Sequence, residues 1–159
     1  MKGYMTVIEI YTDGSCSGNP GPGGWAAVVV DTSTNKIVEV TSGREDYTTN
    51  NRMEMSAILF ALSYYGNSIP PVIVHSDSAY AVNTFTQWMW SWKNNGWKRA
   101  KGQPIENLDL VKTYVDLCEQ GNQIDLRKVD GHKGIKWNEI ADGLATGRLK
   151  EEDVIKTYG

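Results

Sequence analysis

The sequence predicts an α/β domain built on a five-stranded mixed sheet flanked by helices, and three observations point to it. Three β-branched runs near the N-terminus are separated only by turn residues, which is typical of an antiparallel meander. Two later β-branched runs alternate with stretches of helical periodicity, which is typical of parallel strands joined through helices. With 159 residues, 40% of them hydrophobic, the chain is long enough for one full core. We therefore expect a single domain over residues 1–159.

The predicted meander has three strands rich in valine, isoleucine, threonine and aromatic residues. They span residues 5–11, 25–30 and 36–42. Between the first two lies a glycine- and proline-rich segment, 14–24, which we expect to form a turn. Asp13 stands where the first run ends, so we expect it at a sheet edge beside backbone that a ligand can approach. The alternative is an ordinary hairpin turn with a solvated aspartate.

The second half of the chain alternates helices and strands. The expected helices span residues 53–65, 79–88, 105–120 and 138–149, and the expected strands 72–77 and 124–129. Side chains from Thr48 to Asn51 are suited to cap the first of these helices, and Ser78 the second. Residues 130–134 are expected to form a loop, and residues 150–159 a short polar tail.

Composition and charge narrow the class of protein. The formal net charge of −3 argues against a generally basic nucleic-acid coat, although a net value hides local clusters. No run approaches the roughly 18 apolar residues of a membrane span, so no membrane contact is expected. Cys16 and Cys118 are two thiols in a chain without an N-terminal apolar signal core, which favours a reducing compartment. We expect a cytoplasmic monomer.

Four acidic residues stand where an α/β sheet builds its crevice. Asp13 and Asp77 end β-branched runs, Glu54 opens an apolar helical stripe, and Asp142 lies on the last helix. Clustered carboxylates repel one another unless cations lie between them, and all-oxygen ligands suit Mg²⁺ or Mn²⁺ better than Zn²⁺. Two such ions about 3.5–4 Å apart would orient water and stabilise both oxygens of a phosphodiester displacement. On spacing alone, scattered solvated carboxylates remain the alternative.

Four segments of the sequence carry distinctive motifs. They are TDGSCSGNPGPGG at 12–24, TTNNRME at 48–54, SDS at 76–78, and Gly131-His132 followed by Asn138-Glu139 and Asp142. In order and spacing they closely resemble the bacterial-type ribonuclease H family, over nearly the whole chain. The resemblance implies the ribonuclease H-like fold, in which an antiparallel meander is followed by parallel strands. It also implies endonucleolytic cleavage of the RNA strand of RNA–DNA hybrids, with two Mg²⁺ ions for which Mn²⁺ can substitute, to give 5′-phosphate and 3′-hydroxyl ends.

The resemblance also implies roles for the residues in these motifs. Asp13, Glu54, Asp77 and Asp142 match the metal-binding catalytic carboxylates of the family. His132 matches a base or proton shuttle on a mobile loop. The ordinary pKa of histidine lies near neutrality, as a shuttle requires, whereas a lone histidine in a loop is otherwise simply solvated.

A second implied site is a phosphate-binding corner at Thr49 and Asn50. Hydroxyl, amide and free backbone N–H groups at a helix start suit an anion, and in the family this corner holds a DNA phosphate. A plain helix cap is the alternative, and one residue can serve both roles. Asn19 and Asn51 are implied to reach the minor groove of the hybrid, where ribose 2′-hydroxyls and base edges are displayed.

Residues 85–103 hold positive charge that the net value conceals. They contain no acid, four basic residues and four of the six tryptophans, a combination that suits a nucleic-acid backbone. The segment matches the basic protrusion, or handle, of the family. The residues expected to contact nucleic acid are Trp88, Trp92, Trp97, Lys98, Arg99 and Lys101. Core packing is the alternative for Trp88 and Trp92, which share one helix face, so Trp97 is the better candidate for contact.

Three features depart from the family pattern. Ala79 follows Ser78 where many members carry glutamine, Asn94-Asn95 replaces a denser basic run, and the loop after His132 lacks a second histidine. None of them touches the four carboxylates, so the first two bear on affinity rather than on chemistry. Two other classes remain as alternatives: a hybrid-binding module that does not cut, and another metal nuclease or recombinase on a related fold.

Overall fold

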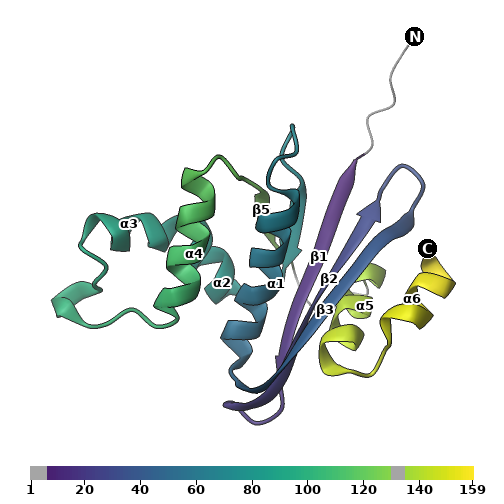
Figure 1. Ribbon diagram of the computed structural model, residues 1–159, viewed down its shortest axis with the longest axis horizontal. Helices are drawn as coiled ribbons and strands as arrows, with labels where there is room; N and C mark the ends of the chain where they lie inside the picture. The colour runs from purple at the N-terminus through teal and green to yellow at the C-terminus, as the bar shows by residue number, and fades with distance from the viewer. Residues whose placement is uncertain (1–6, 130–134) are drawn as a thin grey trace.

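The computed structural model describes residues 7–129 and 135–159. A five-stranded sheet with the order β3-β2-β1-β4-β5 forms its middle layer (Figure 1). The strands are β1 (Ile8–Cys16), β2 (Gly21–Asp31), β3 (Lys36–Thr48), β4 (Ile73–Ser76) and β5 (Asp125–Lys128). The first three pair antiparallel, whereas β4 is parallel to β1 and β5 is parallel to β4. The predicted fold class is confirmed.

Helices lie on both faces of the sheet (Figure 1). They are α1 (Asn50–Tyr65), α2 (Ala79–Asn83), α3 (Met89–Asn94), α4 (Leu108–Glu119), α5 (Lys136–Thr146) and α6 (Glu151–Tyr158). A π-helical turn, η1 (Thr84–Trp88), joins α2 to α3, so the single helix predicted over 79–88 is divided; a 3₁₀ turn, η2 (Ala100–Gly102), follows α3. Along the described part of the chain, no helix combines the length and apolar character that crossing a membrane requires.

The strand β2 is buried on both of its faces. Ala26 and Val28 pack in a cluster with residues of α5, whereas Ala27 and Val29 pack in another cluster with a residue of α1. Successive side chains of a strand point to opposite faces of the sheet, so burial on both faces produces a continuous apolar run. This packing sets α1 and α5 against opposite faces of the sheet.

The glycine-rich segment is largely strand, so the predicted turn over 14–24 is wrong in extent. The strand β1 continues to Cys16 and β2 begins at Gly21, which leaves residues 17–20 for the turn. The glycines are needed where other backbone approaches the sheet: a Cβ atom on Gly24 would lie 2.4 Å from the carbonyl oxygen of Ala145 in α5. Glycine inside a strand here marks close packing rather than a chain reversal.

Asp13 does not lie at a sheet edge as predicted. It belongs to β1, the central strand, where it is paired with Ala26 of β2. On the other side of β1, pairing with β4 ends at Tyr11 and His75, two residues before Asp13. Asp13 therefore lies just beyond the end of the parallel part of the sheet, where neighbouring backbone leaves space for a side chain.

The C-terminal segment is a helix and not the predicted polar tail. In α6, Val154 is buried, and the ring of Tyr158 meets Trp137 of α5 edge-on with centroids 6.0 Å apart. Glu151 at the start of α6 accepts a hydrogen bond from Ser42 of β3. A helix of two turns carries too few apolar positions for its period to stand out in the sequence.

Candidate active site

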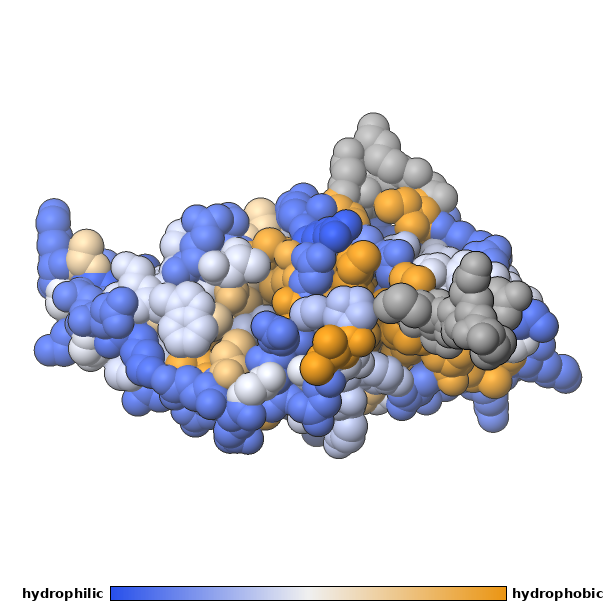
Figure 2. Space-filling view, turned by 90° about the horizontal axis from the view of Figure 1, so that it is seen from above, coloured by the Kyte–Doolittle hydropathy of each residue, from blue (hydrophilic) through white to orange (hydrophobic). Residues whose placement is uncertain are grey.

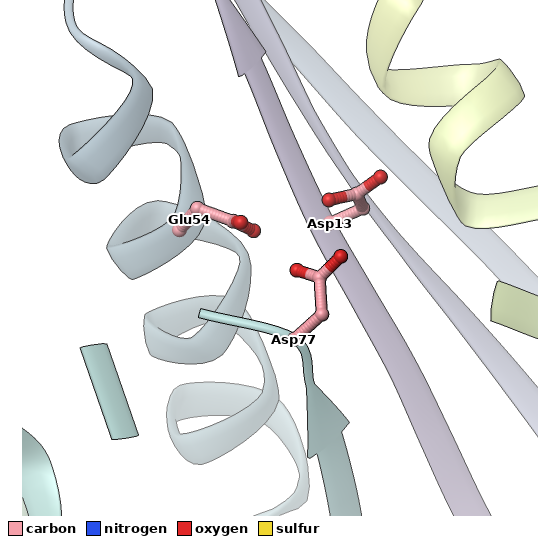
Figure 3. Close-up of side chains that lie close together, drawn as sticks. All are labelled: Asp13, Glu54 and Asp77. Carbon is pink, nitrogen blue, oxygen red and sulfur yellow. The ribbon is translucent and has the colours of Figure 1, made fainter. Parts of the chain in front are cut away.

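Three acidic side chains from different elements point toward one another (Figure 3). Asp13 comes from β1, Glu54 from the first turns of α1, and Asp77 from the residue after β4. One carboxylate oxygen from each lies within 4.8 Å of the other two. Asp13 and Glu54 are 6% and 5% exposed, so most of the negative charge in this cluster is shielded from water.

Gly14 makes this convergence sterically possible. A Cβ atom at position 14 would lie 2.2 Å from the backbone nitrogen of Glu54 and 2.4 Å from the carbonyl carbon of Met53. No side chain fits in that space, so glycine allows the start of α1 to rest directly on β1. The contact sets Glu54 beside Asp13, the residue that precedes Gly14.

A hydrogen bond ties β1 to β4 at the same level. The hydroxyl of Thr12 donates to the carbonyl oxygen of His75 at 2.8 Å, next to the last parallel pair of the two strands. Ser76 ends β4, and its hydroxyl accepts from the backbone N–H of Ser78 at 3.2 Å, which turns the chain around Asp77. These two hydrogen bonds fix the backbone next to Asp13 and around Asp77.

Burial and mutual repulsion dominate the electrostatics of the cluster. Burial raises the pKa of Asp13, and the charges of Asp77 and Asp142 raise it further. The backbone N–H of Gly14, which donates to Oδ1 of Asp13 at 2.9 Å, lowers this pKa but does not offset the other effects. Burial also raises the pKa of Glu54, and the charges of Asp13 and Asp77 add to this effect. Carboxylates in such a place keep protons at neutral pH unless a cation compensates them.

The chemistry of the cluster fits a hard divalent cation. All of its ligand atoms are carboxylate oxygens, which Mg²⁺ and Mn²⁺ prefer. Oε1 of Glu54 is buried without a hydrogen-bond partner among the described residues. A buried polar atom without a partner is unfavourable by about 1–3 kcal/mol, and a bound cation would remove that penalty.

Asp142, the fourth predicted carboxylate, borders the cluster but is not enclosed by it. It lies on α5 with its side chain 53% exposed, and it contributes to the raised pKa of Asp13. Its Oδ2 atom lies 3.5 Å from Nη1 of Arg148. The structure therefore brings three of the four acids together, with Asp13 and Glu54 buried and Asp77 half-buried, and leaves Asp142 at the solvent boundary. His132 lies outside the described residues.

The residues predicted to form a phosphate-binding corner lie together at the start of α1. Thr49 caps the helix, and its hydroxyl accepts from the N–H of Arg52 at 3.2 Å. The backbone N–H of Asn50, which the sequence suggests is free, donates to Oδ1 of Asn19 at 2.9 Å. Asn19 and Asn50 are exposed and Asn51 is half-buried. The four residues thus share one corner, although one of its N–H donors already has a partner.

The tryptophans of the handle are divided between packing and exposure. Trp92 and Trp97 pack against the cluster between α1 and α4, and Nζ of Lys112 lies 5.4 Å from the centroid of the Trp97 ring. Trp88 is 39% exposed, with its ring centroid 6.0 Å from that of Trp92. Trp97, the better candidate on sequence grounds, is thus the more tightly packed, and Trp88 and Trp90 offer the exposed rings.

The basic residues of the handle differ in whether their side chains already have a partner within the protein. Lys98 and Lys101 are exposed, whereas Nε of Arg99 donates to the carbonyl oxygen of Pro104 at 2.9 Å. Lys93 forms an ion pair with Glu119 of α4. Seen from above, the projecting end of the molecule that carries α3 is mainly hydrophilic (Figure 2). Lys98 and Lys101 are the handle cations best placed to meet a polyanion.

Comparison with known proteins then decides the family. The family model RNase H matches residues 5–150, which include the three clustered carboxylates, Asp142, the corner and the handle. The chain belongs to the ribonuclease H family. The predicted resemblance is confirmed, and the chain is a ribonuclease H-type hydrolase.

Relatives of this ribonuclease H-family chain match it along most of their length. The ribonuclease H of Thermoanaerobacter sp. (strain X514) is 42% identical over 151 residues, which are 94% of each chain. That of Syntrophomonas wolfei is 44% identical over 147 residues, 92% of this chain and 98% of the relative. A crystal structure of LC9-RNase H1, described as a type 1 RNase H with the type 2 active-site motif, superposes with a TM-score of 0.75 at 32% identity. That superposition covers 97% of this chain and 76% of the other.

A network that positions the start of α1 in this ribonuclease H fold was not predicted from the sequence. Both terminal nitrogens of Arg52 donate to the carboxylate of Asp109, at 3.0 and 2.7 Å, and Nη1 also reaches Oδ1 of Asn107 at 3.3 Å. Asn107 in turn donates to the hydroxyl of Tyr80 at 3.1 Å. Arg52 stands between the corner and Glu54 in the sequence, and that position was the available signal. Its partners lie more than fifty residues away, so local patterns do not identify them.

Proposed function

We propose that this chain cleaves the RNA strand of RNA–DNA hybrids endonucleolytically and leaves 5′-phosphate and 3′-hydroxyl ends. The observation that carries the proposal is the convergence of Asp13, Glu54 and Asp77 within 4.8 Å in a member of the ribonuclease H family. These residues, with Asp142 at the boundary, would hold two Mg²⁺ ions, for which Mn²⁺ can substitute. A cytoplasmic location and a monomeric state remain predictions.

Bound divalent ions would supply an activated water and charge stabilisation at the scissile phosphate. The chain itself supplies rigid, poorly hydrated oxygens, since Asp13 and Glu54 are buried and their backbones are fixed through Gly14. Rigid preorganised groups lose little free energy to reorganisation during reaction. Asp142 meets solvent, where a substrate can approach. His132 would carry a proton to or from the reacting oxygens.

Recognition of the hybrid would use two surfaces, the corner at the start of α1 and the handle. Both are built from side chains that the sequence singles out. Thr49 and Asn50 would bind a DNA phosphate, and Asn19, held against Asn50, would reach the minor groove together with Asn51. Ribose 2′-hydroxyls in that groove distinguish RNA from DNA. The exposed lysines of the handle would add backbone contacts that do not depend on sequence.

Substrate choice tests the proposal directly. With Mg²⁺ present, a labelled RNA–DNA hybrid should be cut while duplex DNA and duplex RNA are spared, and chelation of the metal should stop the reaction. Gel analysis of the three substrates, with product ends identified by phosphatase sensitivity, provides the measurement. Binding of the hybrid without any cutting would favour a binding module. Comparable cutting of duplex DNA would favour another metal nuclease on this fold.

The handle gives a second test through the salt dependence of binding. Replacing Lys98, Arg99 and Lys101 together by alanine should raise KM and leave kcat nearly unchanged, because the lost contacts are remote from the reacting bond. The slope of log K against log salt should fall by up to about 0.9 for each lost phosphate contact. Lys93→Ala is the matched control, since Lys93 is paired with Glu119 and should change the slope less. An unchanged slope in the triple variant would mean that these residues are ordinary solvated surface residues and do not contact phosphate.

A further inference from the structure

We propose that the positive charge of Arg148 offsets the negative charge of Asp142 and so weakens divalent-metal binding at the open side of the site. This inference rests on the proposed function, because it takes Asp142 as a metal ligand. Nη1 of Arg148 lies 3.5 Å from Oδ2 of Asp142. Among the described residues, this is the one ion pair that involves any of the four carboxylates. Arg148 therefore faces the same carboxylate that a cation at the open side of the site requires.

The backbone after α5 is shaped to place Arg148 there. Gly147 ends the helix in a left-handed conformation, with φ of 82°, and the N–H of Leu149 then donates to the carbonyl oxygen of Gly143 at 2.9 Å. The chain is thus folded back along the last turn of the helix. A Cβ atom on Gly143 would lie 2.5 Å from Leu149 Cδ1 and 3.1 Å from Arg148 Nη2. Glycine next to Asp142 leaves room for the guanidinium to reach the carboxylate.

The direction of the effect follows from the charges at the boundary. Asp142 acts on Asp13, so its carboxylate contributes to the negative potential that attracts a dication. A guanidinium at 3.5 Å reduces this potential and shares the oxygen that the metal needs. Removing the guanidinium should therefore strengthen metal binding.

The size of the effect follows from exposure. The side chains of Arg148 and Asp142 are 58% and 53% exposed, so the pair is screened by water and opens readily. Exposed ion pairs of this kind change an equilibrium constant by about two- to fivefold. We expect a shift of that size in the Mg²⁺ concentration at half-saturation.

The test compares Arg148→Ala and Arg148→Gln with the charge-conserving Arg148→Lys. Lys36→Ala is the matched control, because Lys36 is an exposed cation at the opposite end of β3 from the corner. The Tm of each protein is measured against Mg²⁺ concentration without nucleic acid, and hybrid cleavage is measured over the same range. Both neutral variants should reach half-saturation at about two- to fivefold lower Mg²⁺ in both assays. Arg148→Lys and Lys36→Ala should follow the parent.

Several results would overturn the inference. They are Mg²⁺ affinity that is unchanged or weaker in both neutral variants, an equal shift in Lys36→Ala, and a parent Tm that does not respond to Mg²⁺. A rise in KM for the hybrid with no change in Mg²⁺ dependence would make Arg148 a phosphate contact instead. If the parent does not cut the hybrid but the Tm assay shows the expected shift, the proposed function fails and the inference stands. If the parent cuts the hybrid but its variants show no shift, the inference fails and the proposed function stands.

Discussion

Asp13→Asn is expected to lower Mg²⁺-dependent cleavage of the hybrid by several orders of magnitude while leaving the metal-free protein at least as stable as the parent. The substitution keeps the shape of the side chain and removes one ligand charge from the three-carboxylate cluster. Without metal, the Asp13 carboxyl must either take up a proton at neutral pH or stay charged among like charges, and asparagine avoids both costs. Mg²⁺ should raise the Tm of the parent more than that of the variant, because a ligand that binds only the folded state stabilises it.

The stability difference should depend on pH with a definite sign. Burial and neighbouring charge raise the pKa of Asp13 above its value in the unfolded chain. At pH values between the unfolded and the folded pKa, the folded protein therefore binds more protons than the unfolded chain. The metal-free parent should therefore lose stability as pH rises above about 4, and Asp13→Asn should lose less. Thermal unfolding of both proteins in chelator across pH 4–8 provides the measurement.

Asp31→Asn serves as a control of opposite sign. Asp31 is the half-buried last residue of β2, and its pKa is lowered by hydrogen bonds from Ser33 at 2.6 and 2.9 Å. The stability that the Asp31 carboxylate contributes is present above its pKa in the unfolded chain and is lost as pH falls through the lowered pKa of the folded state. The Tm of Asp31→Asn should therefore lie slightly below that of the parent at neutral pH. If Asp13→Asn instead has a Tm well below that of the parent in chelator, the charge of Asp13 is stabilised by a protein cation or by hydrogen-bond donors. The interpretation of the three carboxylates as a mutually repulsive cluster would then be wrong.

Gly14→Ala is expected to destabilise the protein by about 3 kcal/mol and to disrupt metal binding, although it adds a single methyl group. The new carbon would lie 2.2 Å from the backbone nitrogen of Glu54, which belongs to a helix and cannot rotate away. The start of α1 must then move off β1, and Glu54 moves with it. Chemical denaturation gives the loss of stability, and the Mg²⁺-dependent change in Tm gives the loss of the site.

Ser15→Ala is the matched control for this prediction. Ser15 is the next residue of β1 and is only half-buried, so its replacement should change the free energy of unfolding by about 0.5 kcal/mol or less. A Gly14→Ala protein within about 1 kcal/mol of the parent would show that α1 does not rest on β1 at this point.

Much of the fold was predictable because the period of apolar residues is a local property. The helix over 53–65 and the strand over 72–77 are found within a few residues of their predicted limits, because burial on one face or on both faces gives successive side chains a regular apolar pattern. The strand predicted over 36–42 begins at Lys36 as expected but continues to Thr48. The family motifs similarly placed Asp13, Glu54 and Asp77 in one site, and their side chains do converge.

The glycine-rich segment shows what local patterns leave open. Glycine is as suitable for a turn as for a strand crossed closely by other backbone, and the choice depends on what packs against it. At Gly14 and Gly24 that neighbour is a helix more than thirty residues away in the sequence, as the crowded positions of their missing Cβ atoms show. The extended strands, and the central place of Asp13, therefore required the tertiary structure.

By itself, the sequence determined the order of the strands, the main helices between them, the family and three acids that converge, because these depend on residue type and spacing along the chain. It did not reveal α6, which was predicted as a polar tail. The tertiary structure alone decided the partners of those residues. It paired Arg52 with Asp109, packed Trp97 against the cluster between α1 and α4, and turned Arg148 back onto Asp142. Each of these contacts depends on where a distant segment or a chain reversal places a charge or a ring, and no local period records that position.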